Sequence, residues 1–147
     1  MKIKDIMSRN IINCNLNSTV YDVAKLMKEY NIGIIPIIDE DLMGVITDRD
    51  IVIKCVYNND PSIKSYISDN IISIEEDKEI ESALKLMKEK KVKRLIVTKE
   101  KEIVGILSLS DIIKNSNSKE IINTIKSIYG IKDNMFNENS LVDSFYL

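Results

Sequence analysis

Apolar and polar positions alternate along the chain in two regimes, one with helical spacing and one typical of strands. Two segments carry apolar residues at i, i+3, i+4 and i+7, the spacing of one helix face. These stripes are Val20, Val23, Ala24 and Met27, and Ile80, Ala83, Leu84 and Met87. We expect Asn17 and Asp77 to be the N-caps of these two helices, because short polar side chains satisfy the first backbone N–H groups.

Runs rich in β-branched residues follow each helical stripe, at 34–38 and 94–98. Polar turns at 39–41 and 99–101 separate them from second runs at 42–47 and 103–108, which is a β-hairpin pattern. Extended starts are expected at 11–12 and 71–72. A second helix is expected after each hairpin, burying Ile51, Val52 and Cys55 in one case and Ile112 and Ile113 in the other. The predicted unit is therefore β-α-β-β-α.

The unit occurs twice. Residues 25–29 recur identically at 85–89, and one extra residue in the second hairpin turn changes the offset from 60 to 61, so that Gly44 matches Gly105. We predict a mixed α/β (α+β) fold with a first repeat at 1–60, a second at 61–116 and a tail at 117–147. Each unit has a helix stripe and a sheet face to cover, so the repeats should pack on each other.

Composition narrows the chemistry further. The 147 residues include 21 basic and 23 acidic side chains, a net charge of −2, so no strong field favours DNA or an anionic membrane. There is no histidine, which excludes His-based nucleophile triads and histidine zinc sites. Cys14 and Cys55 are expected to be reduced and buried. With no apolar run long enough for a signal peptide or a membrane span, we expect a cytoplasmic protein.

The segments that carry chemistry are Thr47-x-x-Asp50 and Ser108-x-x-Asp111. Read plainly, each is a capping box, in which hydroxyl and carboxylate satisfy the first helical turn. Each also follows a glycine by three residues, where backbone can approach a ligand, and lies at a strand-to-helix junction that favours anions. Because an Asp offers acceptors for the two hydroxyls of a ribose, the pattern also fits a nucleotide site.

Taken together and in order, these segments resemble the CBS motif, named after cystathionine β-synthase. The resemblance covers residues 3–116. It rests on the segments 4–7, 35–39 and 44–51 of the first copy and 93–97 and 105–112 of the second. It implies a Bateman module with pseudo-twofold symmetry and two clefts between the repeats. Such clefts commonly hold AMP, ADP, ATP, S-adenosylmethionine or cyclic dinucleotides.

The resemblance also implies which residues line each cleft. The main cleft would join Thr47, Asp50, Ile71, Ser73, Lys93 and Arg94, and the second would join Met7, Ile12, Gly33, Ile34, Ser108 and Asp111. We expect the Asp50 cleft to be the main nucleotide site, because Arg94 and Lys93 suit a phosphate. The alternative is that these two cations are a solvated pair that closes a Lys/Glu-rich helix. We expect no catalytic residues, no metal and no catalytic cofactor.

The tail and the overall function leave alternatives open. Ser118 is expected to cap a helix striped by Ile121, Ile122, Ile125 and Ile128, which packs on the module or a dimer mate or binds an unknown protein partner. The resemblance favours a homodimeric, regulatory adenine-nucleotide sensor used in signalling. The runner-up is a ligand-free interaction module, and a small enzyme is a distant third.

Overall fold

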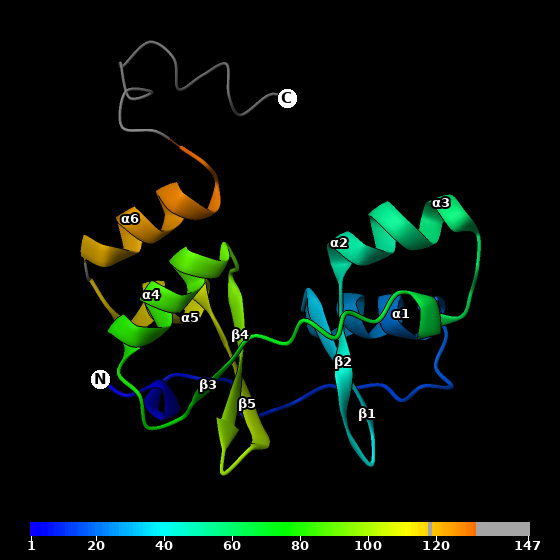
Figure 1. The fold of residues 1–147 in the computed structure, drawn as a ribbon, viewed down its shortest axis with the longest axis horizontal. Helices are drawn as coiled ribbons and strands as arrows, with labels where there is room; N and C mark the ends of the chain where they lie inside the picture. Colours follow the sequence, from blue (N-terminus) through cyan, green and yellow to red (C-terminus); the bar gives the residue numbers. More distant parts are fainter. Residues whose placement is uncertain (118, 132–147) are drawn as a thin grey trace. The chain divides into compact units, whose positions relative to one another are not determined.

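The structure is a computed structural model, and it describes residues 1–117 and 119–131 (Figure 1). Its sheets are a two-stranded β1-β2 hairpin and a three-stranded sheet ordered β3-β4-β5. The elements in chain order are η1 (Ile3–Asp5), α1 (Val20–Tyr30), β1 (Ile34–Asp39), β2 (Asp41–Thr47), α2 (Asp48–Asp50), η2 (Ile51–Cys55), α3 (Val56–Asn58), η3 (Ile63–Ser65), β3 (Ser73–Glu75), α4 (Ile80–Lys90), β4 (Arg94–Lys99), β5 (Glu102–Ser108), α5 (Leu109–Asn115) and α6 (Lys119–Ile128). The predicted mixed fold of two repeats is confirmed.

The two hairpins differ by one residue at the turn, as the repeat offset predicts. Glu40, with a φ of 65°, is the single residue between β1 and β2. Glu100 and Lys101, with φ values of 50° and 73°, connect β4 to β5. Positive φ at both central residues is the signature of the tight turn that matches the twist of a two-stranded ribbon. The extra residue is therefore absorbed entirely at the hairpin tip.

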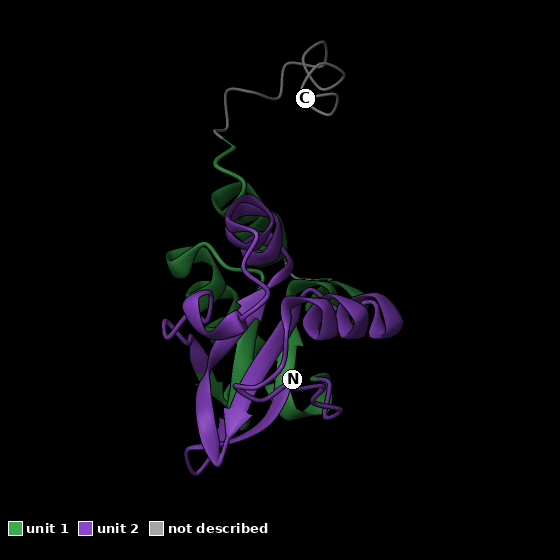
Figure 2. Cartoon of the chain, turned by 90° about the vertical axis from the view of Figure 1, so that its right-hand side faces the viewer, with its two compact units in different colours: residues 1–7, 74–97, 106–147 green, residues 8–73, 98–105 purple. Residues whose placement is uncertain are grey.

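The chain divides into two compact units that do not coincide with the repeats (Figure 2). Unit 1 contains residues 1–7, 74–97 and 106–147, and unit 2 contains 8–73 and 98–105. Residues 1–7 of the first repeat thus belong with the helices of the second. Residues 61–73 belong with the hairpin and helices of the first. Each repeat contributes its leading segment to the other repeat's unit.

Backbone hydrogen bonds explain this exchange within each unit. In unit 1, Ile3 donates to the carbonyl of Lys78 at 2.9 Å, and Lys4 Nζ lies 2.7 Å from Asp77 Oδ1. In unit 2, Val20 donates to the carbonyl of Pro61 at 2.9 Å, where α1 begins. The exchanged segments therefore meet the chain at the turn that precedes each long helix.

The core of unit 2 confirms most of the predicted helical stripe. Val23 and Met27 are buried with Ile35, Ile37 and Ile46. Val20 packs against this cluster, whereas Ala24 is exposed. In α4 the equivalent stripe is buried throughout, comprising Ile80, Ala83, Leu84 and Met87. Cys14 and Cys55 are free and buried, as predicted.

Two predictions about the long helices were wrong at their N-termini. α1 is capped by Thr19, not by Asn17, and its hydroxyl accepts from Asp22 N–H. α4 is preceded by Glu79, whose side chain makes no cap bond, instead of by Asp77. Asp77 is engaged by Lys4, and its carboxylate is therefore used for an ion pair.

Two predicted buried residues are exposed. Val52 is 68% exposed and Ile113 is 46% exposed, while the preceding Ile112 is buried. Neighbours in a helix point about 100° apart, so the second member of a consecutive pair can fall outside the packed face, although Ala83 and Leu84 of α4 are both buried. The expected strand at 11–12 is also absent from the described residues, where Cys14 makes an isolated bridge to Ile37. Its counterpart is β3, which begins two residues after Ile71.

The predicted tail helix is present as α6, and Ser118 lies outside the described residues. α6 lies beside α4 in unit 1 (Figure 1). Ile121 and Thr124 are buried, and Thr124 Oγ1 donates to the carbonyl of Glu120 at 2.8 Å. Ile122, which was expected on the packed stripe, is 59% exposed. The helix therefore packs through a narrower face than the sequence predicts.

Candidate functional site

The Thr47 box, defined as Thr47 and Asp50, lies where β2 ends and α2 begins. Asp50 Oδ2 accepts from Thr47 N–H at 3.0 Å and from Thr47 Oγ1 at 2.8 Å, while Asp50 N–H donates back at 3.2 Å. Gly33 and Ile34 lie beside it, since Asp48 N–H donates to the Gly33 carbonyl and Ile34 pairs with Thr47. The carboxylate is therefore fixed by its own chain.

Lys54 is a member of this site that the sequence analysis missed. Its Nζ lies 2.9 Å from Asp50 Oδ1, the oxygen that Thr47 does not use. Although burial raises the pKa of Asp50, hydrogen bonds from Lys54 and Thr47 outweigh it and hold that pKa below its ordinary value. The available signal was the i, i+4 spacing of an acid and a lysine after the motif.

The Ser108 box, defined as Ser108 and Asp111, repeats this geometry between β5 and α5. Asp111 Oδ2 accepts from Ser108 N–H at 2.8 Å and from Ser108 Oγ at 2.5 Å. Ser110 Oγ lies 2.7 Å from Ser108 Oγ. Among residues 1–117 and 119–131, no cation pairs with Asp111. In both boxes the hydroxyl residue therefore holds Oδ2 of the aspartate. The boxes differ at Oδ1, which is paired with Lys54 only in the Thr47 box.

Lys93, one of the two cations predicted for the main cleft, lies next to the Ser108 box through a backbone hydrogen bond. Leu109 N–H, the first of α5, donates to the Lys93 carbonyl at 2.8 Å. The ammonium of Lys93 lies 5.5 Å from the ring centroid of Tyr129, just after α6. Lys93 thus has a cation–π partner rather than only solvent.

We expected Gly44 to let a ligand approach the backbone closely. In the structure it is the 67–68 segment of the protein that lies close to Gly44. A Cβ there would lie 2.3 Å from Ile67 Cγ2 and 2.5 Å from the Ser68 carbonyl oxygen. Val45 and Ser68 exchange backbone hydrogen bonds at 2.9 and 3.0 Å. The absence of a side chain at Gly44 is therefore explained by packing of the 67–68 segment on β2.

The predicted cleft residues divide between the two compact units. Unit 2 contains Ile12, Gly33, Ile34, Thr47, Asp50, Ile71 and Ser73. Unit 1 contains Met7, Lys93, Arg94, Ser108 and Asp111. Each predicted cleft combines residues of both units, so its composition stays a prediction. Within single units, the structure brings together each hydroxyl with its carboxylate.

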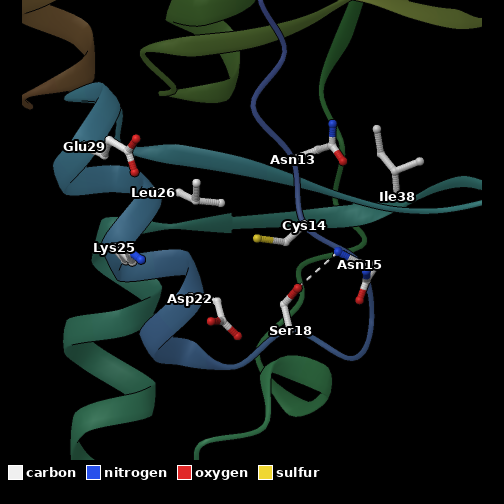
Figure 3. Close-up of a pocket in the computed structure, with 9 residues that line it drawn as sticks. All are labelled: Asn13, Cys14, Asn15, Ser18, Asp22, Lys25, Leu26, Glu29 and Ile38. Carbon is white, nitrogen blue, oxygen red and sulfur yellow. Dashed lines mark hydrogen bonds between the residues drawn. The ribbon is translucent and has the colours of Figure 1, made fainter.

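A pocket of about 480 Å³ lies in unit 2, on the α1 side of the 13–18 segment (Figure 3). Its lining is Asn13, Cys14, Asn15, Ser18, Asp22, Lys25, Leu26, Glu29 and Ile38. Several of its polar groups already have partners: Asn15 N–H donates to Ser18 Oγ, and Asp22 accepts from Thr19. Burial raises the pKa of the Cys14 thiol, which favours its protonated form.

Neither a metal-binding cluster nor a membrane-spanning helix occurs in the described part of the chain. No group of three or more cysteine, aspartate or glutamate side chains there is arranged to hold a metal ion. None of the helices in the same residues is both long and apolar enough to cross a bilayer.

Comparison with known proteins adds a family and its relatives. The CBS domain model matches the chain twice, at residues 3–56 and 63–118. YlbB of Bacillus subtilis (strain 168) is 35% identical over 125 residues, which are 81% of this chain and 84% of that protein. Hypoxic response protein 1 of Mycobacterium tuberculosis (strain ATCC 25618 / H37Rv) is 32% identical, covering 85% of this chain and 92% of its own.

One solved structure bears on ligands. The CBS domain pair of protein MJ0100, solved in complex with 5-methylthioadenosine and S-adenosyl-L-methionine, matches with a TM-score of 0.72 and 29% identity. The match covers 78% of this chain and 94% of that one.

Proposed function

The chain belongs to the CBS domain family, and on that premise we propose that it is a regulatory module that binds adenosine-containing ligands through its two boxes. The observation that carries the proposal is that both boxes occur at the same strand-to-helix junction with the same bonded oxygen. In each, Oδ2 is held by the chain, which orients the carboxylate; Oδ1 of Asp111 is left to meet a ribose, and at Asp50 a ribose would have to displace Lys54 from Oδ1. The ligands of the MJ0100 pair share an adenosine moiety, which supports this class of ligand.

The two boxes are proposed to prefer ligands of different charge. The main site joins Thr47 and Asp50 to Ile71, Ser73 and the cations Lys93 and Arg94, so it takes AMP, ADP or ATP. The second joins Ser108 and Asp111 to Met7, Ile12, Gly33 and Ile34, none of which is a cation. Lys93, which neighbours this box through its backbone carbonyl, has its ammonium over the ring of Tyr129. That site takes a less charged adenosine compound. S-adenosylmethionine and cyclic dinucleotides are further candidate ligands of the module as a whole. The role of the chain is binding rather than catalysis.

The module is proposed to act as a homodimer. Val52, Val56 and Tyr57 are 68%, 71% and 88% exposed on the helical segment that follows the Thr47 box. A second copy would bury this apolar face next to the ligand site, so that binding changes dimer geometry. Sedimentation should show a dimer, and Val56→Glu should shift it to monomer. A wild-type chain that is monomeric at high concentration contradicts this part.

The two cysteines bear on the cellular compartment that we propose for the module. Cys14 and Cys55 are both free thiols, which is typical of proteins kept in a reducing compartment. We therefore place the module in the cytoplasm, where it would bind an adenosine compound as a signal and pass that signal to a partner.

The test is thermal unfolding with AMP, ADP, ATP, S-adenosylmethionine, cyclic di-AMP and adenosine, for the wild type, Asp50→Ala and Asp111→Ala. A ligand present at about 100 times its Kd stabilises the folded state by about 2.7 kcal/mol, which shifts Tm measurably. We expect Asp50→Ala to abolish the shift with AMP and Asp111→Ala to spare it. The reverse pattern would exchange the two sites. No shift with any compound would favour the ligand-free interaction module.

A further inference from the structure

Asp50 and Asp111 occupy equivalent positions, yet the fourth residue after each differs in kind. After Asp50 comes Lys54, and 61 positions later, after Asp111, comes Asn115. Lys54 Nζ lies 2.9 Å from the Asp50 carboxylate. Asn115 Nδ2 instead donates to the backbone carbonyl of Asp111, at 2.7 Å. One helical turn after the motif, the first repeat therefore has a lysine that binds the Asp50 carboxylate. The second repeat has an asparagine that binds the backbone instead of the Asp111 carboxylate.

The two carboxylates therefore differ in whether an oxygen is still available to accept a hydrogen bond from a ligand. Asp50 has Oδ2 engaged by Thr47 and Oδ1 engaged by Lys54. Asp111 has Oδ2 engaged by Ser108, and no hydrogen bond or ion pair reaches Oδ1 from the described residues 1–117 and 119–131. Charge-assisted hydrogen bonds are stronger than those from a neutral hydroxyl, so a ribose competes poorly with an ammonium for the same oxygen.

Burial strengthens the argument at the first box. The Asp50 side chain is 16% exposed, whereas Lys54 is 49% exposed. The ion pair therefore joins a half-exposed ammonium to a mostly buried carboxylate, and a ligand that binds Asp50 Oδ1 has to compete with Lys54 for it. The local helix is unusual here: η2 is a π-helical turn closed by Val56 N–H on the Ile51 carbonyl, a feature found often at functional sites.

We infer that Lys54 sets the ligand selectivity of the Thr47 box by occupying the oxygen of Asp50 that a ribose would use. This inference rests on the proposed function. An uncharged adenosine must displace Lys54 and gains nothing from it. A phosphorylated ligand releases Lys54 and offers it a new anionic partner. The Ser108 box, with Asn115 at the matching position, has no such barrier to an uncharged adenosine compound.

The repeat supplies a reciprocal experiment. Adenosine binding is measured by calorimetry in two backgrounds, Asp111→Ala to isolate the Thr47 box and Asp50→Ala to isolate the Ser108 box. Lys54→Asn in the first background should lower the adenosine Kd by about two- to fivefold, the range expected for one ion pair whose lysine is half exposed. Asn115→Lys in the second should raise it by a similar factor. Asn115→Met is the matched control and should leave it unchanged.

A second ligand separates competition at the ribose from a general effect on folding. With 2′,3′-dideoxyadenosine, which lacks the diol, Lys54→Asn should leave the Kd unchanged. Adenosine binding that is unaffected or weakened by Lys54→Asn overturns the inference and leaves the proposed function standing. An Asn115→Met effect as large as that of Asn115→Lys also overturns it. Adenosine and AMP binding absent from the wild type and every variant overturns both.

Discussion

Thr19 Oγ1 lies 2.8 Å from Asp22 Oδ2, the same separation that joins Thr47 Oγ1 to Asp50 Oδ2. Thr19 caps α1, so the chain contains a third hydroxyl–carboxylate box that the family resemblance does not assign to a ligand. The geometry of the box alone is that of a helix cap. What distinguishes the Thr47 and Ser108 boxes is their position after a hairpin strand.

This relationship yields a matched pair of variants. Thr19→Ala and Thr47→Ala should each lower the free energy of unfolding by about 1 kcal/mol, because each removes a cap. Only Thr47→Ala should also weaken AMP binding, measured by calorimetry below the unfolding range. Equal losses of AMP affinity in the two variants would mean that the binding effect is merely a loss of stability.

The Asp50 carboxylate gives stability a defined pH dependence. Its pKa is depressed in the folded protein, so it stabilises the fold above its unfolded pKa of about 3.9. That contribution is lost as the pH falls through the lower folded pKa. In urea unfolding, Asp50→Asn should be less stable than the wild type at pH 7, and the gap should narrow below about pH 4. A gap that stays constant down to pH 2.5 would show that Asp50 does not titrate as described.

Neighbouring isoleucines on α6 test how this helix packs. Ile121 is 8% exposed and Ile122 is 59% exposed. Ile121→Ala should cost about 2 kcal/mol of unfolding free energy, the lower end for a buried isoleucine. Ile122→Ala should change it by less than about 0.5 kcal/mol. Similar losses from both substitutions would place Ile122 in a contact, such as a dimer interface.

Gly44 tests the close packing of the 67–68 segment on β2. Gly44→Ala places a methyl group against Ile67 and the Ser68 carbonyl, and should lower the unfolding free energy by about 1–3 kcal/mol. The control is Met43→Ala at a neighbouring position, where the side chain is 45% exposed and little should change. An unchanged Gly44→Ala midpoint in urea would show that the segment moves aside without cost.

Much of the fold was accessible from periodicity. The stripe ending at Met87 and the extra turn residue near Glu100 are both local patterns, and the structure contains both. The N-caps were harder to predict, because Asn17 and Thr19 are both competent caps. The hydrogen bond from Val20 N–H to the Pro61 carbonyl at the start of α1 is long-range and leaves no local signal. The exchange of leading segments between units is long-range, and no local pattern encodes it.

The candidate site also contains residues that local patterns could predict and one residue that they could not. Thr47, Asp50, Ser108 and Asp111 could be identified because the motif repeats, and the structure joins each hydroxyl to its carboxylate. Lys54 was missed because it lies just outside the motif, on a helix expected to contribute only core residues. Its importance depends on which carboxylate oxygen is left free, and that is a matter of three-dimensional geometry.

The most direct test of the central claim is calorimetric titration with AMP and adenosine of the wild type, the Asp50→Ala/Asp111→Ala double variant and an Asp22→Ala control. The control removes the third box, at α1, and should keep the wild-type affinity and stoichiometry. The double variant should remain folded and bind neither compound. A folded double variant that binds both as tightly as the wild type would contradict the claim that these carboxylates hold the ligand.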